Sequence, residues 1–173
     1  MLRLFHTFIT DPLSVIAHAS DGKELRWLCV LGIVAASFAM EIFVAGSFGS
    51  LILRFIVSAS MLTLFILIQS LLHDVCAQWF SGKAQSLSLF FFQGVTLLPY
   101  ALLVPIHMIG KLPVFSDIAF LLKLIIFFCV FFLQIQTLKV RYNLSFIKSL
   151  FIYISPLFFV FIAVIIFSLG VWL

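Results

Sequence analysis

Residues 51–80 decide the class of fold, and they read LILRFIVSASMLTLFILIQSLLHDVCAQWF. Arg54 and Asp74 are the formal charges in this stretch, whose apolar residues are continuous rather than alternating with polar ones. A helix needs about 20 apolar residues to cross the hydrocarbon core of a bilayer, and this stretch is longer than that. Membrane β-barrel strands alternate apolar and polar residues, so the run indicates a helix instead. We therefore expect a tilted membrane-spanning helix here.

The rest of the chain has the same character. Hydrophobic residues make up 65% of it, charged residues 9%, and its mean hydropathy is +1.33. The 23 phenylalanines recur along the whole length, so the apolar material is not one anchor on a soluble domain. A water-soluble fold of this size could not bury so much apolar surface. The composition predicts an all-α integral membrane protein with five membrane-spanning helices, over 27–45, 51–80, 87–108, 115–138 and 146–172.

The first 25 residues lack the continuous apolar core of a cleavable signal peptide, so we expect this start to be retained. We expect residues 1–25 to form a cytoplasmic or interfacial segment, and residues 26–173 to form a five-span membrane domain. Asp11-Pro12 offers a helix N-cap followed by a proline at the first helical position. Residues 11–20 are therefore either a short interfacial helix or an ordered lead-in to the first span.

Basic residues gather on one side of the predicted spans, and lysine and arginine bias sets membrane orientation. One side carries Arg3, Lys23, Arg26, Lys83, Lys139, Arg141 and Lys148, and the other carries Arg54, Lys111 and Lys123. The first side is expected to be cytoplasmic, with the N-terminus inside and the C-terminus outside. Lys83, Lys139, Arg141 and Lys148 form a basic cytoplasmic rim, which is either a topology signal alone or a surface for anionic lipid or an acidic partner.

Two stretches of the sequence resemble each other. Residues 86–99 and 143–156 each run from a polar loop through Leu-Ser into an apolar segment and then a proline, Pro99 or Pro156. The similarity predicts either a parallel repeat of two-helix hairpins, spans two-three and four-five, or a coincidence of a biased composition. An even number of crossings per unit would relate the copies by an axis along the membrane normal.

Glu41 and Arg54 are the first candidates for a site within the membrane. Ionisable side chains within the hydrocarbon core cost free energy unless they are paired with an opposite charge or contact water. They are therefore candidates for functional positions. The two residues stand about equally far from the turn at 46–50, hence at similar depth on adjacent helices. We expect an intramembrane ion pair that clamps two helices; a proton or ligand site, or two residues that do not meet, are the alternatives.

Other features concern helix geometry. Pro99, Pro105 and Pro156 each interrupt helical hydrogen bonding and predict kinks, which serve either gating or static packing. A face of small residues on the first span suits close helix packing, within the chain or with a partner. These small residues are Gly32, Ala35, Ala36 and Ala39.

The sequence indicates no catalytic or metal site. It contains no phosphate-binding glycine loop, helical HExxH or nucleophile–base–acid set, so we expect neither an enzyme nor a cofactor. His73-Asp74 and His107 are expected at opposite depths, which argues against a three-ligand metal site. The cysteines, which we expect to be buried small hydrophobes, are Cys29, Cys76 and Cys129.

Taken together, these features resemble the Yip domain family, five-span membrane domains named for Ypt/Rab-interacting proteins. The resemblance rests on Asp11-Pro12, on the end of the second span at 72–83, on Gln93-Gly94 followed by Leu98-Pro99, and on 144–156. Val95 stands where the trafficking members carry tyrosine, and Asp11-Pro12 alone, in a segment of about 25 residues, stands where they carry a long N-terminal region with an Asp-Leu-Tyr-Gly-Pro-like motif. The resemblance therefore implies the short bacterial type, some of which are associated with ABC-type exporters.

Two functions compete. The first is a non-catalytic accessory or scaffold subunit of a membrane transport or trafficking assembly, which would pair its ionisable residues within the fold. The second is a small transporter or channel, with a wet cavity near Glu41 or Lys123 lined by Gln69, Gln93, Thr96, Gln134 and Gln136. The expected partners are the lipid bilayer and other membrane proteins, not nucleic acid. The expected location is a bacterial inner membrane, with the eukaryotic ER or Golgi membrane as the alternative.

Overall fold

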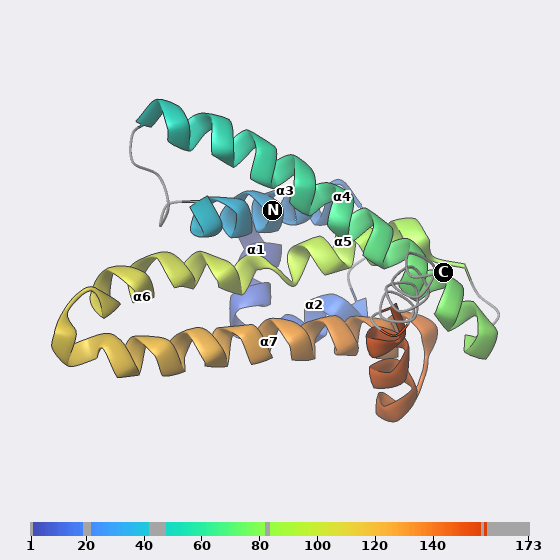
Figure 1. The fold of residues 1–173 in the computed structure, drawn as a ribbon. Helices are drawn as coiled ribbons and strands as arrows, with labels where there is room; N and C mark the ends of the chain where they lie inside the picture. The colour runs from blue at the N-terminus through green and yellow to red at the C-terminus, as the bar shows by residue number, and fades with distance from the viewer. Residues whose placement is uncertain (1, 19–21, 42–47, 82–83, 157, 159–173) are drawn as a thin grey trace, which may run out of the picture.

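The computed structural model describes residues 2–18, 22–41, 48–81, 84–156 and 158, of which 92% are helical and none lie in strands. The chain folds as an all-helical bundle (Figure 1). Its elements are α1 (Leu2–Thr10), α2 (Pro12–His18), α3 (Lys23–Glu41), α4 (Phe48–Ser81), α5 (Ser86–Val95), η1 (Leu98–Leu102), α6 (Leu103–Gly110), η2 (Pro113–Phe115) and α7 (Ser116–Tyr142). A further helix, Phe146–Pro156, follows α7.

Among the described residues, three helical stretches are long and apolar enough to cross a membrane: Leu51–Ser81, Ser86–Gly110 and Pro113–Tyr142. They coincide within a few residues with the second, third and fourth predicted spans. The first predicted span is described as α3 as far as Glu41, and its residues beyond that lie outside the described part. The fifth is described over Phe146–Pro156 only. The structure therefore supports three spans, and the total of five stays a prediction.

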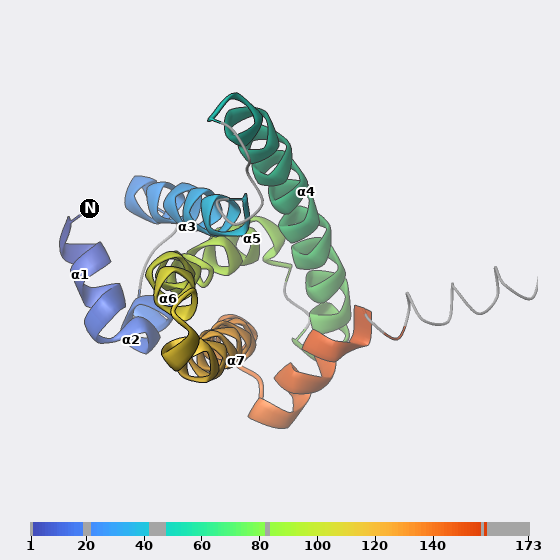
Figure 2. The same ribbon diagram turned by 60° about the vertical axis from the view of Figure 1, so that its left-hand side comes forward.

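The middle of the chain forms an antiparallel hairpin, in which α5, η1 and α6 run beside α7 (Figure 1). α3 packs on α5 and η1, and α4 packs on α3 and α5. Figure 2, which looks nearly along the hairpin, places α4 at the edge of the bundle. In the most apolar 18-residue stretch of α4, only 6% of the residues are buried inside the protein. Because this helix is apolar on all sides, most of its surface faces lipid or a partner.

Close contact between α3 and α5 depends on two glycines. A Cβ atom on Gly32 would lie 2.0 Å from the carbonyl oxygen of Gly94, and one on Gly94 would lie 2.3 Å from Cys29 Sγ. Ala36 and Ala39 on the same face of α3 are fully buried. Gly32, Ala36 and Ala39 therefore pack within the chain, whereas Ala35 is only partly buried and lines a groove.

The N-terminal segment is helical and belongs to the main core. The Asp11 carboxylate accepts a hydrogen bond from the backbone N–H of Ser14 at 3.2 Å, so α2 has the N-cap that the sequence predicts. The sequence did not predict α1. Phe8, Val15 and Ile16 pack in one cluster with core residues of α3, α5 and α7. Residues 2–18 are therefore anchored on the membrane domain by apolar contacts.

The cysteine prediction is wrong at one position. Cys29 and Cys76 are buried, whereas Cys129 is exposed. Cys129 lies on a side of α7 that other elements leave partly uncovered, and it lines a groove with Phe5 and Pro99. An apolar neighbourhood in a membrane segment does not by itself imply burial in protein, because lipid is equally apolar.

Candidate functional site

A set of polar side chains meets where α4, α5, α7 and the last helix converge. We call this set the polar cluster. Its members are His73 and Asp74 of α4, Gln93 of α5, Gln134 and Tyr142 of α7, and Tyr153 of the helix after α7. Figure 2 shows the last helix passing from the end of α7 to α4. This crossing brings residues of four separate segments together.

Asp74 is buried, with 4% of its surface exposed, and its two oxygens accept hydrogen bonds from three donors. Oδ1 accepts from the backbone N–H of Gln85 at 2.8 Å and from the hydroxyl of Tyr142. Oδ2 accepts from Nε2 of Gln78 at 2.9 Å. A buried carboxylate is costly unless it is hydrogen-bonded, and here the donors come from three segments. Asp74 therefore ties the end of α4 to the start of α5 and the end of α7.

His73 links three helices. Its side chain is fully buried, with Nδ1 at 2.8 Å from Nε2 of Gln93 and Nε2 at 3.2 Å from the carbonyl oxygen of Tyr153. Because the Gln93 amide nitrogen can only donate, Nδ1 is the acceptor. The proton then resides on Nε2 and is donated to Tyr153. The neutral imidazole with its proton on Nε2 makes both hydrogen bonds. His73 can therefore connect α4 to α5 and to the last helix without any change of charge.

Beside His73 lies a cavity of about 380 Å³ with mostly apolar walls. Gln69, His73, Gln134 and Tyr153 contribute its polar lining. The Tyr153 hydroxyl donates to Oε1 of Gln134 at 2.5 Å, and the Tyr153 ring packs edge-on against Phe131.

This cavity contains part of the polar set that the transporter hypothesis expected. Gln69 and Gln134 line it, whereas Gln93 and Thr96 are fully buried. Gln93 is bonded to His73, and Thr96 donates to the Gln93 carbonyl at 2.7 Å. The predicted polar residues therefore divide between a cavity wall and the interior of the bundle.

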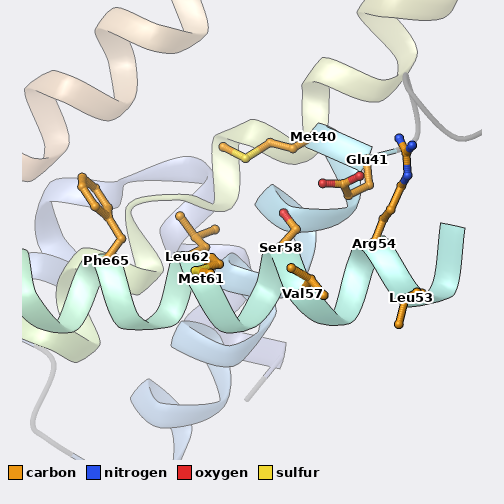
Figure 3. Close-up of a pocket in the computed structure, with 9 residues that line it drawn as sticks. All are labelled: Met40, Glu41, Leu53, Arg54, Val57, Ser58, Met61, Leu62 and Phe65. Carbon is orange, nitrogen blue, oxygen red and sulfur yellow. The ribbon is translucent and has the colours of Figure 1, made fainter. Parts of the chain in front are cut away.

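Glu41 and Arg54 lie together in a different place. Glu41 ends α3 and Arg54 is in the second turn of α4, and both line a groove of about 460 Å³ between these helices. Figure 3 shows the two charged side chains at one end of the groove and Phe65 at the other. The structure thus brings the predicted pair to one site, while the ion pair itself stays a prediction. Neither residue lines the cavity beside His73.

The three prolines occupy different positions in their helices. Pro99 is the second residue of η1, where the span Ser86–Gly110 changes from α-helix to 3₁₀-helix. Pro105 is the third residue of α6, within the first turn, where a backbone N–H has no intrahelical acceptor in any case. Pro156 is the last residue of the described stretch Phe146–Pro156.

The basic residues differ in their surroundings. The guanidinium of Arg141 stacks over Phe92 at 3.7 Å, and Nζ of Lys148 lies 5.9 Å from the centre of the Phe80 ring. Lys139 and Arg141 lie in the last turn of α7, where cations complement the helix dipole. Lys83 lies outside the described residues. Lys123, near the other end of α7, has its Nζ 3.4 Å from Nδ1 of His107.

Sequence reasoning noticed His73 and Asp74 only as metal-ligand candidates and missed Tyr142 and Tyr153. The described residues contain no group of three or more His, Cys, Asp or Glu side chains that could hold a metal ion. The available signal was chemical, because a carboxylate and an imidazole within an apolar run require partners. In later helices the Tyr142 hydroxyl donates to the carboxylate, and the Tyr153 backbone carbonyl accepts from the imidazole.

Comparison with protein-family models, with curated protein sequences and with solved structures finds no match to this chain.

Proposed function

We propose that this protein is a non-catalytic helix-packing subunit, an accessory or scaffold component of a membrane transport or trafficking assembly. The observation that carries the proposal is the bonding of the polar cluster. Asp74 is met by three donors and His73 by two partners, all from the same chain. Buried groups that carry transport or proton transfer need a changeable partner, whereas these are held by several segments at once. Such bonding favours a rigid scaffold.

The exposed surface of α4 is the region offered to other helices. Its exposed residues include Leu64, Phe65 and Trp79, each with more than half of its surface exposed. Few residues in the most apolar stretch of α4 are buried. Association of helices in a bilayer relies on van der Waals packing and not on hydrophobic exclusion from water. A long apolar helix at the edge of a bundle supplies a contact surface without any soluble domain.

The finer parts of the proposal follow from the sequence. We place five spans in a bacterial inner membrane, with the N-terminus inside and the C-terminus outside. We also assign the chain to the short bacterial Yip type, with an ABC-type exporter as its partner. The three spans that the structure describes where the sequence predicts them support a membrane protein. The family assignment rests on the sequence resemblance, of which Gln93-Gly94 contacts α4 and α3.

Photo-crosslinking in the membrane tests the proposal. A photoreactive phenylalanine analogue replaces Leu64 or Trp79 on α4, and Phe128, also more than half exposed but on α7, is the control. We expect both α4 probes to capture the same membrane protein and the control to capture lipid only. Crosslinks from all three positions to unrelated proteins would contradict a specific α4 interface.

The cavity beside His73 favours a second function, a small transporter or channel. Gln69 and Gln134 give it hydrogen-bonding groups within an apolar wall, as in a solute site. Purified protein alone in liposomes distinguishes the two functions. Saturable solute flux that Gln134→Leu abolishes, and that a matched change at exposed Phe128 leaves intact, would require the subunit proposal to be withdrawn.

A further inference from the structure

The groove between α3 and α4 combines two opposite charges with a long apolar surface. We call it the α3–α4 groove. Figure 3 shows Glu41 and Arg54 at one end, with Val57, Met61 and Phe65 following along α4. Its volume is about 460 Å³. The Glu41 carboxylate and the Arg54 guanidinium give the groove one negative and one positive group and a net charge of zero. The groove therefore complements a zwitterion better than an ion of one sign.

The length and depth of the groove match one leaflet of a bilayer. From Arg54 to Phe65 the helix advances by about 16 Å, given a rise of about 1.5 Å per residue. Half of a hydrocarbon core of about 30 Å is nearly the same distance. Arg54 lies in the first turn of the candidate span Leu51–Ser81, so a bilayer centred on this helix places the charged end near its surface and Phe65 near its midplane.

The groove is open to lipid along its apolar part. Val57, Met61 and Phe65 are 51%, 64% and 62% exposed. Side chains on this stretch of α4 therefore present a surface that an acyl chain can reach from the bilayer without a conformational change. The other side of the groove is formed by Met40 at the end of α3.

We propose that the α3–α4 groove binds a zwitterionic phospholipid with a primary ammonium headgroup, of the phosphatidylethanolamine class. The Arg54 guanidinium binds the phosphate, because its planar donors match phosphate oxygens in pairs. The Glu41 carboxylate accepts hydrogen bonds from the ammonium, and one acyl chain lies along Val57, Met61 and Phe65. A choline headgroup has a cation but no N–H to donate, and a glycerol headgroup has O–H donors but no cation, so only a primary ammonium offers Glu41 both a charge and a donor. This inference is independent of the proposed function, since lipid binding requires no protein partner.

Lipid retention tests the proposal. The full chain is reconstituted in vesicles of equal parts phosphatidylethanolamine, phosphatidylcholine and phosphatidylglycerol, extracted in mild detergent, and its bound lipids are counted by native mass spectrometry. We expect enrichment of phosphatidylethanolamine. Arg54→Gln should reduce the total phospholipid retained about tenfold, because all three lipids carry the phosphate and each loses one charge-assisted hydrogen bond. Glu41→Gln should abolish the preference over phosphatidylcholine, and Lys111→Gln, a change of a cation outside the groove, should alter nothing.

A further variant separates lipid binding from a purely structural clamp. Val57→Trp fills the apolar part of the groove from an exposed position and leaves both charges in place. We expect it to keep the helix content and elution profile of the unchanged protein while losing phosphatidylethanolamine. Retention of the three lipids in their bulk ratio would overturn the proposal. An undiminished amount of retained phospholipid in Arg54→Gln, or undiminished retention of phosphatidylethanolamine in Val57→Trp, would also overturn it and would leave Glu41 and Arg54 as a clamp.

Discussion

Replacement of Gly32 by alanine should force α3 and α5 apart. The new Cβ atom would lie 2.0 Å from the carbonyl oxygen of Gly94, 3.1 Å from its carbonyl carbon and 3.6 Å from the backbone nitrogen of Leu98. All three atoms belong to the backbone, so no side-chain rotation relieves the contact. The new Cβ atom and the Gly94 oxygen must therefore move apart by about 1.5 Å to reach an ordinary van der Waals distance.

The expected cost follows from the packing on either side. Leu28 and Phe92 are fully buried in the cluster that joins the two helices. A gap of about 0.5–1 Å removes a quarter to a half of the attraction between atoms that were in contact, and overpacking a core costs about 1–3 kcal/mol. Alanine gains about 1 kcal/mol over glycine in a helix, which offsets part of this. We expect Gly32→Ala to lower the free energy of unfolding by about 2 kcal/mol.

Gly94→Ala provides an internal comparison. Its Cβ atom would lie 2.3 Å from Cys29 Sγ, a side-chain atom, and 3.2 Å from Cys29 Cβ. Removal of the sulfur in Cys29→Ala should therefore partly rescue Gly94→Ala, with a coupling of about 1 kcal/mol, and should not rescue Gly32→Ala.

Unfolding by SDS titration in mixed micelles, followed by far-UV circular dichroism, gives these free energies. Ser60→Ala, at an exposed position of α4, serves as the control and should change stability by less than about 0.5 kcal/mol. If Gly32→Ala proves neutral or stabilising, the close contact between α3 and α5 is not a feature of the folded protein. Equal rescue of both glycine variants by Cys29→Ala would likewise refute the steric reasoning.

Two further predictions concern the polar cluster and the orientation of the chain. Tyr142→Phe removes one of three donors to the Asp74 carboxylate and should lower the free energy of unfolding by about 1–3 kcal/mol in the same assay, whereas no change would mean that this hydrogen bond is not formed. A reporter enzyme active only outside the cytoplasm should be active when fused after Leu173 and inactive when inserted at Gly82; the reverse pattern would refute the proposed orientation.

The sequence by itself determined the class of the protein and the positions of its central spans. Residues 51–80, 87–108 and 115–138 were predicted within a few residues of the helices that the structure describes. This succeeds because the length of a span depends on one segment and on the thickness of the bilayer, not on the other helices. The N-cap at Asp11 was predictable for the same reason, since capping involves neighbouring residues only. α1 was missed although its amphipathic pattern is local and it packs chiefly on its neighbour α2.

Only the tertiary structure decided how the polar residues are paired and which faces are buried. Asp74 and Tyr142 are 68 residues apart, and His73 and Tyr153 are 80 residues apart. Their contact depends on the rotation of each helix about its axis and on how the last helix crosses α4. A helix as uniformly apolar as α4 carries no local pattern that fixes this rotation, because every face is compatible with lipid. Packing between helices selects it, through contacts such as Gly32 against Gly94 that exist only after the chain has folded.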